Sequence, residues 1–211
     1  MIYFPTLLSG IHEKMKAGLP GDQAHQRMSP PHRLPASHYL NQAINYKEAA
    51  VMALIFPDAN DGRARIIFIE RTGGMDVHAH QISFPGGKKE PNDIDFLDTA
   101  IRETEEEIGV NKNLIIYTGA LSKLYIPPSN FLVYPYVGML DSQPDFILST
   151  KEVKQVISPD LSLFLDPNNK KDAAFKSSQG YEVKAPYYQI GEFKIWGATA
   201  MMISELMEVI S

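Results

Sequence analysis

The hydrophobic positions of this chain fall into short runs that alternate between the spacing of strands and that of helices. Residues 49–56 and 64–71 are rich in β-branched and aromatic side chains, and the turn-forming residues 58–62 join them. This arrangement predicts a β-hairpin. Residues 114–120 and 131–139 are predicted to be further strands, so the centre of the chain holds most of the expected sheet.

Both ends of the chain carry helical spacing. Residues 7–17 predict an amphipathic helix, and residues 198–210 predict a helix that closes the fold. Prolines are dense after the first of these helices, and proline interrupts helices and strands alike. We therefore expect residues 1–45 to form an arm packed on the body, and residues 46–211 to form the one main domain.

The patterns are weaker beyond residue 141. Residues 153–165 mix helical and strand character, residues 168–171 have the composition of a loop, and residues 181–190 predict one strand of a hairpin. Strands and helices thus alternate along the chain, and this alternation predicts a mixed α and β core.

Composition supports a globular protein with one core. The chain has 211 residues, of which 44% are hydrophobic and 21% charged, so an intrinsically disordered chain is excluded. The net charge of −5 provides no overall field for a polyanion, and we expect no nucleic-acid partner. There are no cysteines, which excludes disulfides, iron–sulfur clusters, thiolate zinc sites and thiol catalysis.

The sequence contains neither the pattern of a membrane-spanning helix nor that of an export signal. The longest apolar runs are far shorter than the roughly 20 residues that a spanning helix needs. Residues 1–20 lack the basic start and long apolar stretch of a leader. We therefore expect a cytoplasmic protein with no membrane partner.

The chemistry is concentrated in an acidic helix predicted over residues 95–108, with Gly109 as its C-cap. Successive side chains of a helix are rotated by about 100° around its axis, and four of them lie within about 60° of one another and form the predicted core-facing stripe. It consists of Leu97, Ile101, Thr104 and Ile108. Three glutamates, Glu103, Glu106 and Glu107, fall within an arc of about 100° on a different side.

Such a cluster repels itself and also opposes the helix macrodipole. A divalent cation would compensate, because hard ions such as Mg²⁺ bind carboxylate oxygens and bridge them to substrate phosphates. For an acidic helix alone, a solvated face is the simpler interpretation.

The loop before the helix favours the metal interpretation. Gly86 and Gly87 allow a ligand to approach the backbone closely, and Lys88 and Lys89 bring positive charge to the same place. A Pro-Gly-Gly segment alone is more often a simple turn. Together with the glutamates, however, these residues predict a metal-bridged phosphate site, for which Arg71 and Lys123 are further candidate cations.

The stretch from Gly87 to Val110 resembles the Nudix box, Gly-x5-Glu-x7-Arg-Glu-U-x-Glu-Glu-x-Gly-U, where U is a bulky apolar residue. The matching residues are Arg102, Glu103, Glu106, Glu107, Gly109 and Val110. Thr104 stands at an apolar position, the spacer after Gly87 is one residue longer, and Asp93 is the nearest match for the first glutamate.

The longer spacer and the flank at residues 81–87 resemble the coenzyme A pyrophosphatase branch of that family, as do residues 124–131. Arg71 fits the upstream signature of this branch, whereas Asp76 replaces its basic residue and His80 replaces its glycine.

The resemblance implies an α/β/α sandwich with a mixed β-sheet and metal-dependent hydrolysis of a nucleoside diphosphate-linked small molecule, with Mg²⁺ or Mn²⁺ as cofactor. Coenzyme A, cleaved to 3′,5′-ADP and 4′-phosphopantetheine, is the expected substrate. An ADP-ribose or nucleotide-sugar pyrophosphatase and a catalytically silent binding module are the alternatives. A homodimer also stays open.

Roles follow for the acidic residues. Glu103 and Glu107 are the expected metal ligands, followed by Glu106, and the family likeness adds the carbonyl of Gly86. One of the glutamates, or Glu152 from a later loop, is expected to serve as general base.

Other side chains have simpler interpretations. The helical position of Arg102 favours a structural ion pair over a phosphate clamp. His78 and His80 form a weak zinc pattern, and hydrogen bonding within the loop or contact with a substrate explains them better. Tyr125 and Phe131 could stack on a base, although aromatic residues beside a strand usually belong to the core.

Overall fold

A computed structural model describes residues 1–40, 42, 45–72, 81–176 and 182–211. The α-helices are α1 (Phe4–Lys16), α2 (Asp22–Gln26), α3 (Ala36–Leu40), α4 (Phe96–Ile108) and α5 (Gly197–Ile210). Short 3₁₀ helices are η1 (Lys112–Leu114), η2 (Leu161–Leu165) and η3 (Pro167–Asn169). The strands are β1 (Lys47–Pro57), β2 (Ala64–Ile66), β3 (Phe68–Arg71), β4 (Ile82–Ser83), β5 (Gly86–Lys88), β6 (Ile116–Ala120), β7 (Leu124–Ile126), β8 (Phe131–Met139), β9 (Val153–Ile157), β10 (Lys170–Lys176), β11 (Glu182–Ile190) and β12 (Phe193–Trp196).

A six-stranded mixed sheet forms the centre of the molecule. Its order is β2-β1-β8-β6, with β5 also paired to β1 and β7 to β8. Strands β1 and β8 run parallel, and the other pairs are antiparallel. The predicted hairpin is confirmed, because Ile55 of β1 pairs with Ile66 of β2.

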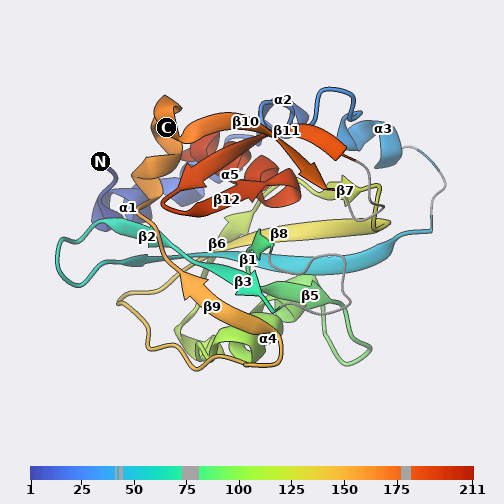
Figure 1. The fold of residues 1–211 in the computed structure, drawn as a ribbon. Coiled ribbons are helices and arrows are strands. Elements are labelled where there is room, and N and C mark those ends of the chain that lie inside the picture. The colour runs from blue at the N-terminus through green and yellow to red at the C-terminus, as the bar shows by residue number, and fades with distance from the viewer. Residues whose placement is uncertain (41, 43–44, 73–80, 177–181) are drawn as a thin grey trace.

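Helices cover both faces of this sheet, as Figure 1 shows with α4 on one side and α1 and α5 on the other. The residues of β1 alternate between two cores: Ala53 and Ile55 pack toward α1 and α5, whereas Met52 and Leu54 pack toward α4. A strand buried on both faces explains the continuous hydrophobic run in the sequence. The α/β/α sandwich expected from the sequence is thus confirmed.

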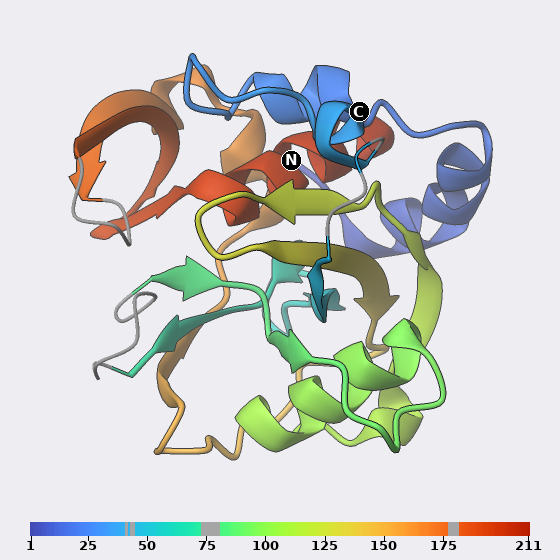
Figure 2. The ribbon, with the colours of Figure 1, turned by 90° about the vertical axis from the view of Figure 1, so that its right-hand side faces the viewer.

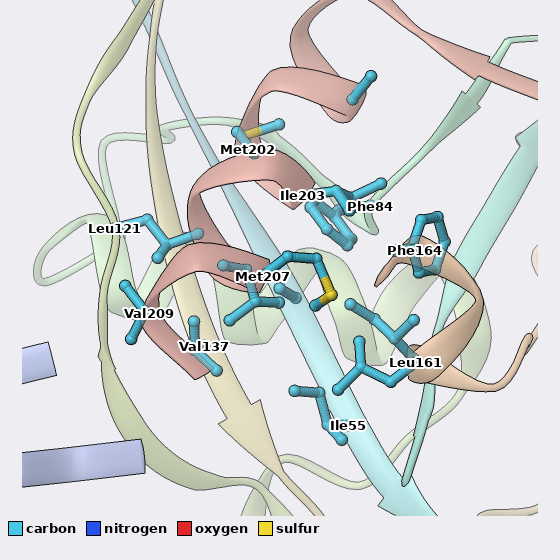
Figure 3. Packing of buried hydrophobic residues seen from close by; sticks show 14 of the residues in the cluster. Ile55, Phe84, Leu121, Val137, Leu161, Phe164, Met202, Ile203, Met207 and Val209 are labelled. Carbon is cyan, nitrogen blue, oxygen red and sulfur yellow. The ribbon is translucent and has the colours of Figure 1, made fainter. Parts of the chain in front are cut away.

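The larger of the two cores lies around α5 (Figure 3). Met202, Ile203 and Met207 of this helix belong to one cluster with Ile55 and Val137 of the sheet. The apolar spacing that predicted a closing helix therefore reflects burial against the sheet, and α5 runs over nearly the predicted residues.

Two three-stranded sheets complete the fold, with the orders β4-β3-β9 and β10-β11-β12. The single strand predicted over residues 64–71 is divided at Ile67, so that β2 joins the central sheet and β3 a second sheet. The loop predicted over residues 168–171 is wrong, because η3 and β10 occupy it. Strand β10 pairs with β11 along its length, and a mostly exposed strand with one paired side tolerates the polar residues that suggested a loop.

The first 45 residues contain more regular structure than their prolines suggested. Helix α1 begins at Phe4, three residues before the predicted start, because Pro5 is tolerated in a first helical turn. Helices α2 and α3 follow, and the α2 residue Asp22 accepts a hydrogen bond of 2.7 Å from the backbone N–H of Ala36.

A buried polar cluster fixes this segment to α5. Glu205 of α5 is fully buried and accepts hydrogen bonds from His25 Nε2 at 2.9 Å and from the backbone N–H groups of Gly21 and Ser122 at 3.1 Å. Burial opposes ionisation of Glu205, but these donors hold its pKa below the ordinary value. Figure 2 shows α2 and α3 lying against the end of the molecule that carries α5. Within the described ranges, no helix is long and apolar enough to cross a membrane.

Candidate active site

Helix α4 carries the acidic residues over almost the predicted range. Asp95 caps its N-terminus by accepting from the backbone N–H of Asp98, and Gly109 ends it in the left-handed conformation with φ 72°. The predicted core-facing stripe is confirmed, because Thr104 and Ile108 are buried and Leu97 and Ile101 pack against the core. Glu107, at 1% exposed, is also buried. Glu107 therefore faces the protein interior, which the simpler interpretation of a solvated acidic face does not explain.

Burial of Glu107 is possible because two donors satisfy its carboxylate. Arg71 Nη1 donates to Oε1 at 3.0 Å, and the backbone N–H of Gly86 donates to Oε2 at 2.8 Å. Burial raises the pKa of Glu107 to about 7, although Arg71 and Gly86 act in the opposite direction. A carboxylate held this way is the perturbed group expected at a functional site.

The two glycines of β5 allow close approach, as predicted, but the nearest groups belong to the chain itself. Gly86 has φ 152°, and a Cβ there would lie 2.3 Å from the carbonyl oxygen of Ala50. A Cβ on Gly87 would lie 2.3 Å from Cδ of Glu103. Glycine is therefore required at Gly86 for β5 to pair with β1, and glycine at Gly87 leaves room for the Glu103 carboxylate.

Arg102 lies at the centre of an ionic network that joins α4 to the preceding loop. Its Nε donates to Asp93 Oδ1 at 2.8 Å and its Nη2 to Asp93 Oδ2 at 3.0 Å. Nη1 also donates to Glu103 and Glu106, at 3.0 and 3.1 Å. The hydrogen bond from Arg102 holds the pKa of the buried Asp93 well below its usual range. The predicted structural ion pair of Arg102 is thus confirmed, and Asp93 is its main partner.

Arg102→Ala is expected to lower the thermal midpoint by several degrees, since it leaves the Asp93 carboxylate buried without its charged partner. For a chain of this size, each kcal/mol lost shifts the midpoint by about 2–4 °C. Because the pKa of Asp93 is lowered in the folded state, the pair stabilises the protein above the ordinary aspartate value and is lost as pH falls below it. Calorimetry of the two proteins at pH 7 and in acid measures this difference.

A double-mutant cycle with Asp93→Asn assigns the effect, because the two substitutions should not add if they break the same pair. An unchanged midpoint together with a large rise in KM would make Arg102 a phosphate-binding residue instead.

Glu152 approaches this site from the turn before β9. Its backbone carbonyl accepts from the N–H of Thr72 at 2.9 Å, next to Arg71 at the end of β3. Burial raises the pKa of both Glu103 and Glu107, and the negative charge of Glu152 adds to this increase. In the described part of the chain, no side chain or backbone group forms a hydrogen bond or ion pair with the exposed Glu152 carboxylate.

The donor chemistry of this region fits a hard divalent ion. Glu103, Glu107 and Glu152 each supply carboxylate oxygens, and the pKa values of Glu103 and Glu107 are raised in part by the other acidic groups. Among the described residues, no three acidic or histidine side chains converge on one point. Two of these carboxylates are instead held by Arg71 and Arg102, so ion binding would require an exchange of partners. Glu106, with its side chain 59% exposed, lies at the outer side.

The predicted cations divide into two groups. Arg71 and Lys88 line a cavity beside the glycines. Lys89 instead donates to the carbonyl of Asp93 at 2.6 Å, and Lys123 lies 4.8 Å from the ring centroid of Tyr134. The predictions for Asp76, His78 and His80 lie outside the described residues.

The cavity has a volume of about 860 Å³, and Gly86 and Gly87 are among the residues that line it. Its walls come from the sheet, from the arm and from the first turn of α5. The lining includes Pro30, Arg33, Tyr39, Lys47, Ala49, Val51, Arg71, Phe84, Lys88, Ile126, Phe131, Val133, Val183, Trp196, Thr199 and Met202. Sequence reasoning missed Arg33, Lys47 and the α5 residues, because no local pattern connects them with the glycines.

The aromatic candidates also divide. Tyr125 is buried and its hydroxyl donates to Asn130 Oδ1 at 3.0 Å, which makes it a core residue. Phe131 instead lines the cavity, as does Trp196, which was not among these candidates.

Comparisons with known proteins agree with this arrangement. The NUDIX domain model matches residues 47–176. Nudix hydrolase 15, mitochondrial, from Arabidopsis thaliana is 33% identical over 73% of this chain and 55% of its own length. The uncharacterized Nudix hydrolase NudL of Yersinia pestis is 29% identical over 88% of this chain and 90% of its own.

The chain spans about half the length of the plant relatives that it matches. Among solved structures, a MutT/nudix family protein from Enterococcus faecalis superimposes with a TM-score of 0.51 at 14% identity, covering 89% of this chain and 70% of that one. The matched residues include β1, β5 and all of α4, which together hold the glycines and glutamates described above. The chain therefore belongs to the Nudix family.

Proposed function

We propose that this protein is a metal-dependent hydrolase of nucleoside diphosphate-linked small molecules. The observation that carries the proposal is the buried Glu107 carboxylate, which accepts a hydrogen bond from the backbone of Gly86, a residue that lines a cavity of about 860 Å³. A solvated acidic face would need neither the burial nor the cavity. Nudix hydrolases generally use divalent metal ions.

Glu103 and Glu107 would hold the ion, with Glu106 and the carbonyl of Gly86 as further ligands. When bound, a divalent ion neutralises the clustered charge of a diphosphate and lowers the pKa of a bound water. Both Mg²⁺ and Mn²⁺ suit these oxygen donors.

The chain itself contributes position and proton transfer. Gly86 and Gly87 let a diphosphate approach the backbone, and Arg71 and Lys88 line the same part of the cavity with positive charge. Glu152 is the favoured general base, since its carboxylate lies near Glu103 and Glu107 without a partner among the described residues. Its task would be to accept the proton of the attacking water.

For the substrate we propose coenzyme A. The resemblance of residues 81–87 and 124–131 to the coenzyme A pyrophosphatase branch supports this choice, and so does a cavity large enough for more than a diphosphate. Water attack would then give 3′,5′-ADP and 4′-phosphopantetheine.

Side-by-side kinetics with Mg²⁺ and with Mn²⁺ test the proposal. We expect coenzyme A to exceed both dephospho-coenzyme A and ADP-ribose in kcat/KM, by roughly 10–150-fold if one charge-assisted hydrogen bond to the 3′-phosphate is lost. ADP-ribose equal to or better than coenzyme A would move the protein to the nucleotide-sugar pyrophosphatases. No turnover of any diphosphate would instead indicate a binding module.

A further inference from the structure

The described side chains that line the cavity beside Gly86 carry an excess of positive charge. Its described lining contains the four cationic residues Arg33, Lys47, Arg71 and Lys88 and no aspartate or glutamate. Arg71 is paired with Glu107, which leaves three cations. No carboxylate of the described residues forms an ion pair with any of these three, which we call the basic rim: Arg33, Lys47 and Lys88.

Strand register places two members of the basic rim on one wall. Lys47, Ala49 and Val51 alternate along β1 and all line the cavity. Lys47 pairs with Phe131 of β8, and Ala49 pairs with Lys88 of β5. The ammonium groups of Lys47 and Lys88 accordingly each lie 5.8 Å from the ring centroid of Phe131. Two like charges thus meet at one aromatic ring.

Arg33 brings the third charge from the arm. It lies between α2 and α3, outside the residues that match the family model, and its Nη2 donates to the carbonyl of Tyr125. This hydrogen bond fixes the half-buried guanidinium at β7, where Ile126 also lines the cavity, as does Ser129 in the loop that follows. Burial lowers the pKa of Arg33, because the charged form has lost solvent without gaining an ion pair. An anionic ligand would supply the missing partner.

The spacing between the glycines and the basic rim suits a nucleotide. Gly86 pairs with Val51, and Lys47 lies four residues before Val51 on the same strand. At about 3.3 Å per residue, this separation is about 13 Å along β1. Long lysine and arginine side chains can span several ångströms of this separation. If the diphosphate of a substrate lies at Gly86, a further phosphate on its nucleoside would therefore reach the basic rim.

We propose that Arg33, Lys47 and Lys88 form a binding site for a phosphate monoester carried by the nucleoside half of the substrate. The site selects nucleoside diphosphate derivatives with this third phosphate, and it makes the arm part of substrate recognition. This inference rests on the proposed function for the orientation of the substrate. Lys89 and Lys123 are not part of this site, since neither belongs to the described lining of the cavity.

Binding of 3′,5′-ADP and 5′-AMP tests the rim without catalysis. These two compounds differ only in the 3′-phosphate, and calorimetry of the full chain with divalent ions chelated measures each affinity. We expect the unaltered protein to prefer 3′,5′-ADP by about tenfold or more, as for a charge-assisted contact. The Lys47→Ala/Lys88→Ala double variant and Arg33→Gln should reduce this preference to near onefold.

Lys123→Ala is the matched control, since it removes one positive charge outside the described lining of the cavity and should keep the preference. Lys47 and Lys88 are exposed and their substitution leaves the core intact, so the double variant remains informative even if Arg33→Gln loosens the arm. Equal affinity of the unaltered protein for both compounds, or a preference that survives in the double variant, would overturn the inference.

Kinetics separate this inference from the proposed function. In the single variant Lys47→Ala, KM for coenzyme A should rise about tenfold or more while kcat/KM for dephospho-coenzyme A stays near the parent value. A protein that hydrolyses no diphosphate but shows the expected binding preference would refute the proposed function and retain the rim. The opposite result is hydrolysis of coenzyme A by the parent protein, with equal losses of kcat/KM for coenzyme A and dephospho-coenzyme A in the variant. That result would refute the rim and retain the proposed function.

Discussion

Glu107→Gln is expected to lower kcat by at least about 10²-fold while the protein remains folded. Glutamine keeps the shape of the side chain but removes the charge that would bind a divalent ion, and that ion supplies several kcal/mol of transition-state stabilisation. The amide can still accept the hydrogen bond from Gly86. Steady-state turnover of coenzyme A, with circular dichroism to monitor the fold, measures the effect.

Metal-dependent melting shows whether the loss reflects the ion. A ligand that binds only the folded state raises the midpoint, so Mg²⁺ or Mn²⁺ should stabilise the parent protein and have little effect on Glu107→Gln. Glu105→Gln is the matched control, because it makes the same charge change on the same helix, where the Glu105 carboxylate accepts a hydrogen bond from the backbone N–H of Lys112. A Glu107→Gln protein with parental turnover would refute the assignment of Glu107 as a metal ligand.

The same variant should alter the pH dependence of stability in metal-free protein. Burial raises the pKa of Glu107 from 4.5 to about 7, so the folded state binds the proton more tightly than the unfolded state. Stability contributed by protonated Glu107 is present below pH 4.5 and is lost as pH rises through about 7. Glu107→Gln lacks this loss, and its midpoint should equal or exceed that of the parent protein at pH 8.

Glu152→Gln is the second variant with a large expected effect. A general base contributes about 10²–10⁴-fold, so kcat should fall by at least about 10²-fold. Glu152 is exposed on a turn and its side chain supports no described contact, so stability should change little. Because the residue acts on water, KM for coenzyme A should remain near the parental value. Single-turnover kinetics of the purified variant measure the chemical step directly.

Metal-dependent melting distinguishes the two glutamates, since Glu152→Gln should retain the stabilisation by Mg²⁺ or Mn²⁺ that Glu107→Gln loses. Glu13→Gln, at an exposed position of α1, controls for the loss of one negative charge. Parental turnover in Glu152→Gln would exclude this residue as the base and direct attention to Glu103.

Local sequence determined the elements that hold the site. The run that becomes β1 is hydrophobic without alternation because both faces of the strand are buried. A continuous hydrophobic run can be recognised from the local sequence alone. Helix α4 begins at an aspartate cap and ends at a left-handed glycine, so its limits depend on neighbouring residues alone. The spacing of Arg102, Glu103, Glu106 and Glu107 against the glycines was likewise sufficient to indicate the family.

The tertiary structure decided which of these residues are buried and what they contact. Helical periodicity placed Glu107 on a different side of the helix from the core-facing stripe, whereas Arg71 and the Gly86 N–H satisfy its carboxylate in the interior. Arg33 and Lys47 reach the cavity because the arm folds back onto the sheet and β1 pairs with β8. Backbone propensities and caps act over a few residues, so sequence reveals them. Desolvation and charge pairing depend on groups distant along the chain, and only the folded structure brings those groups together.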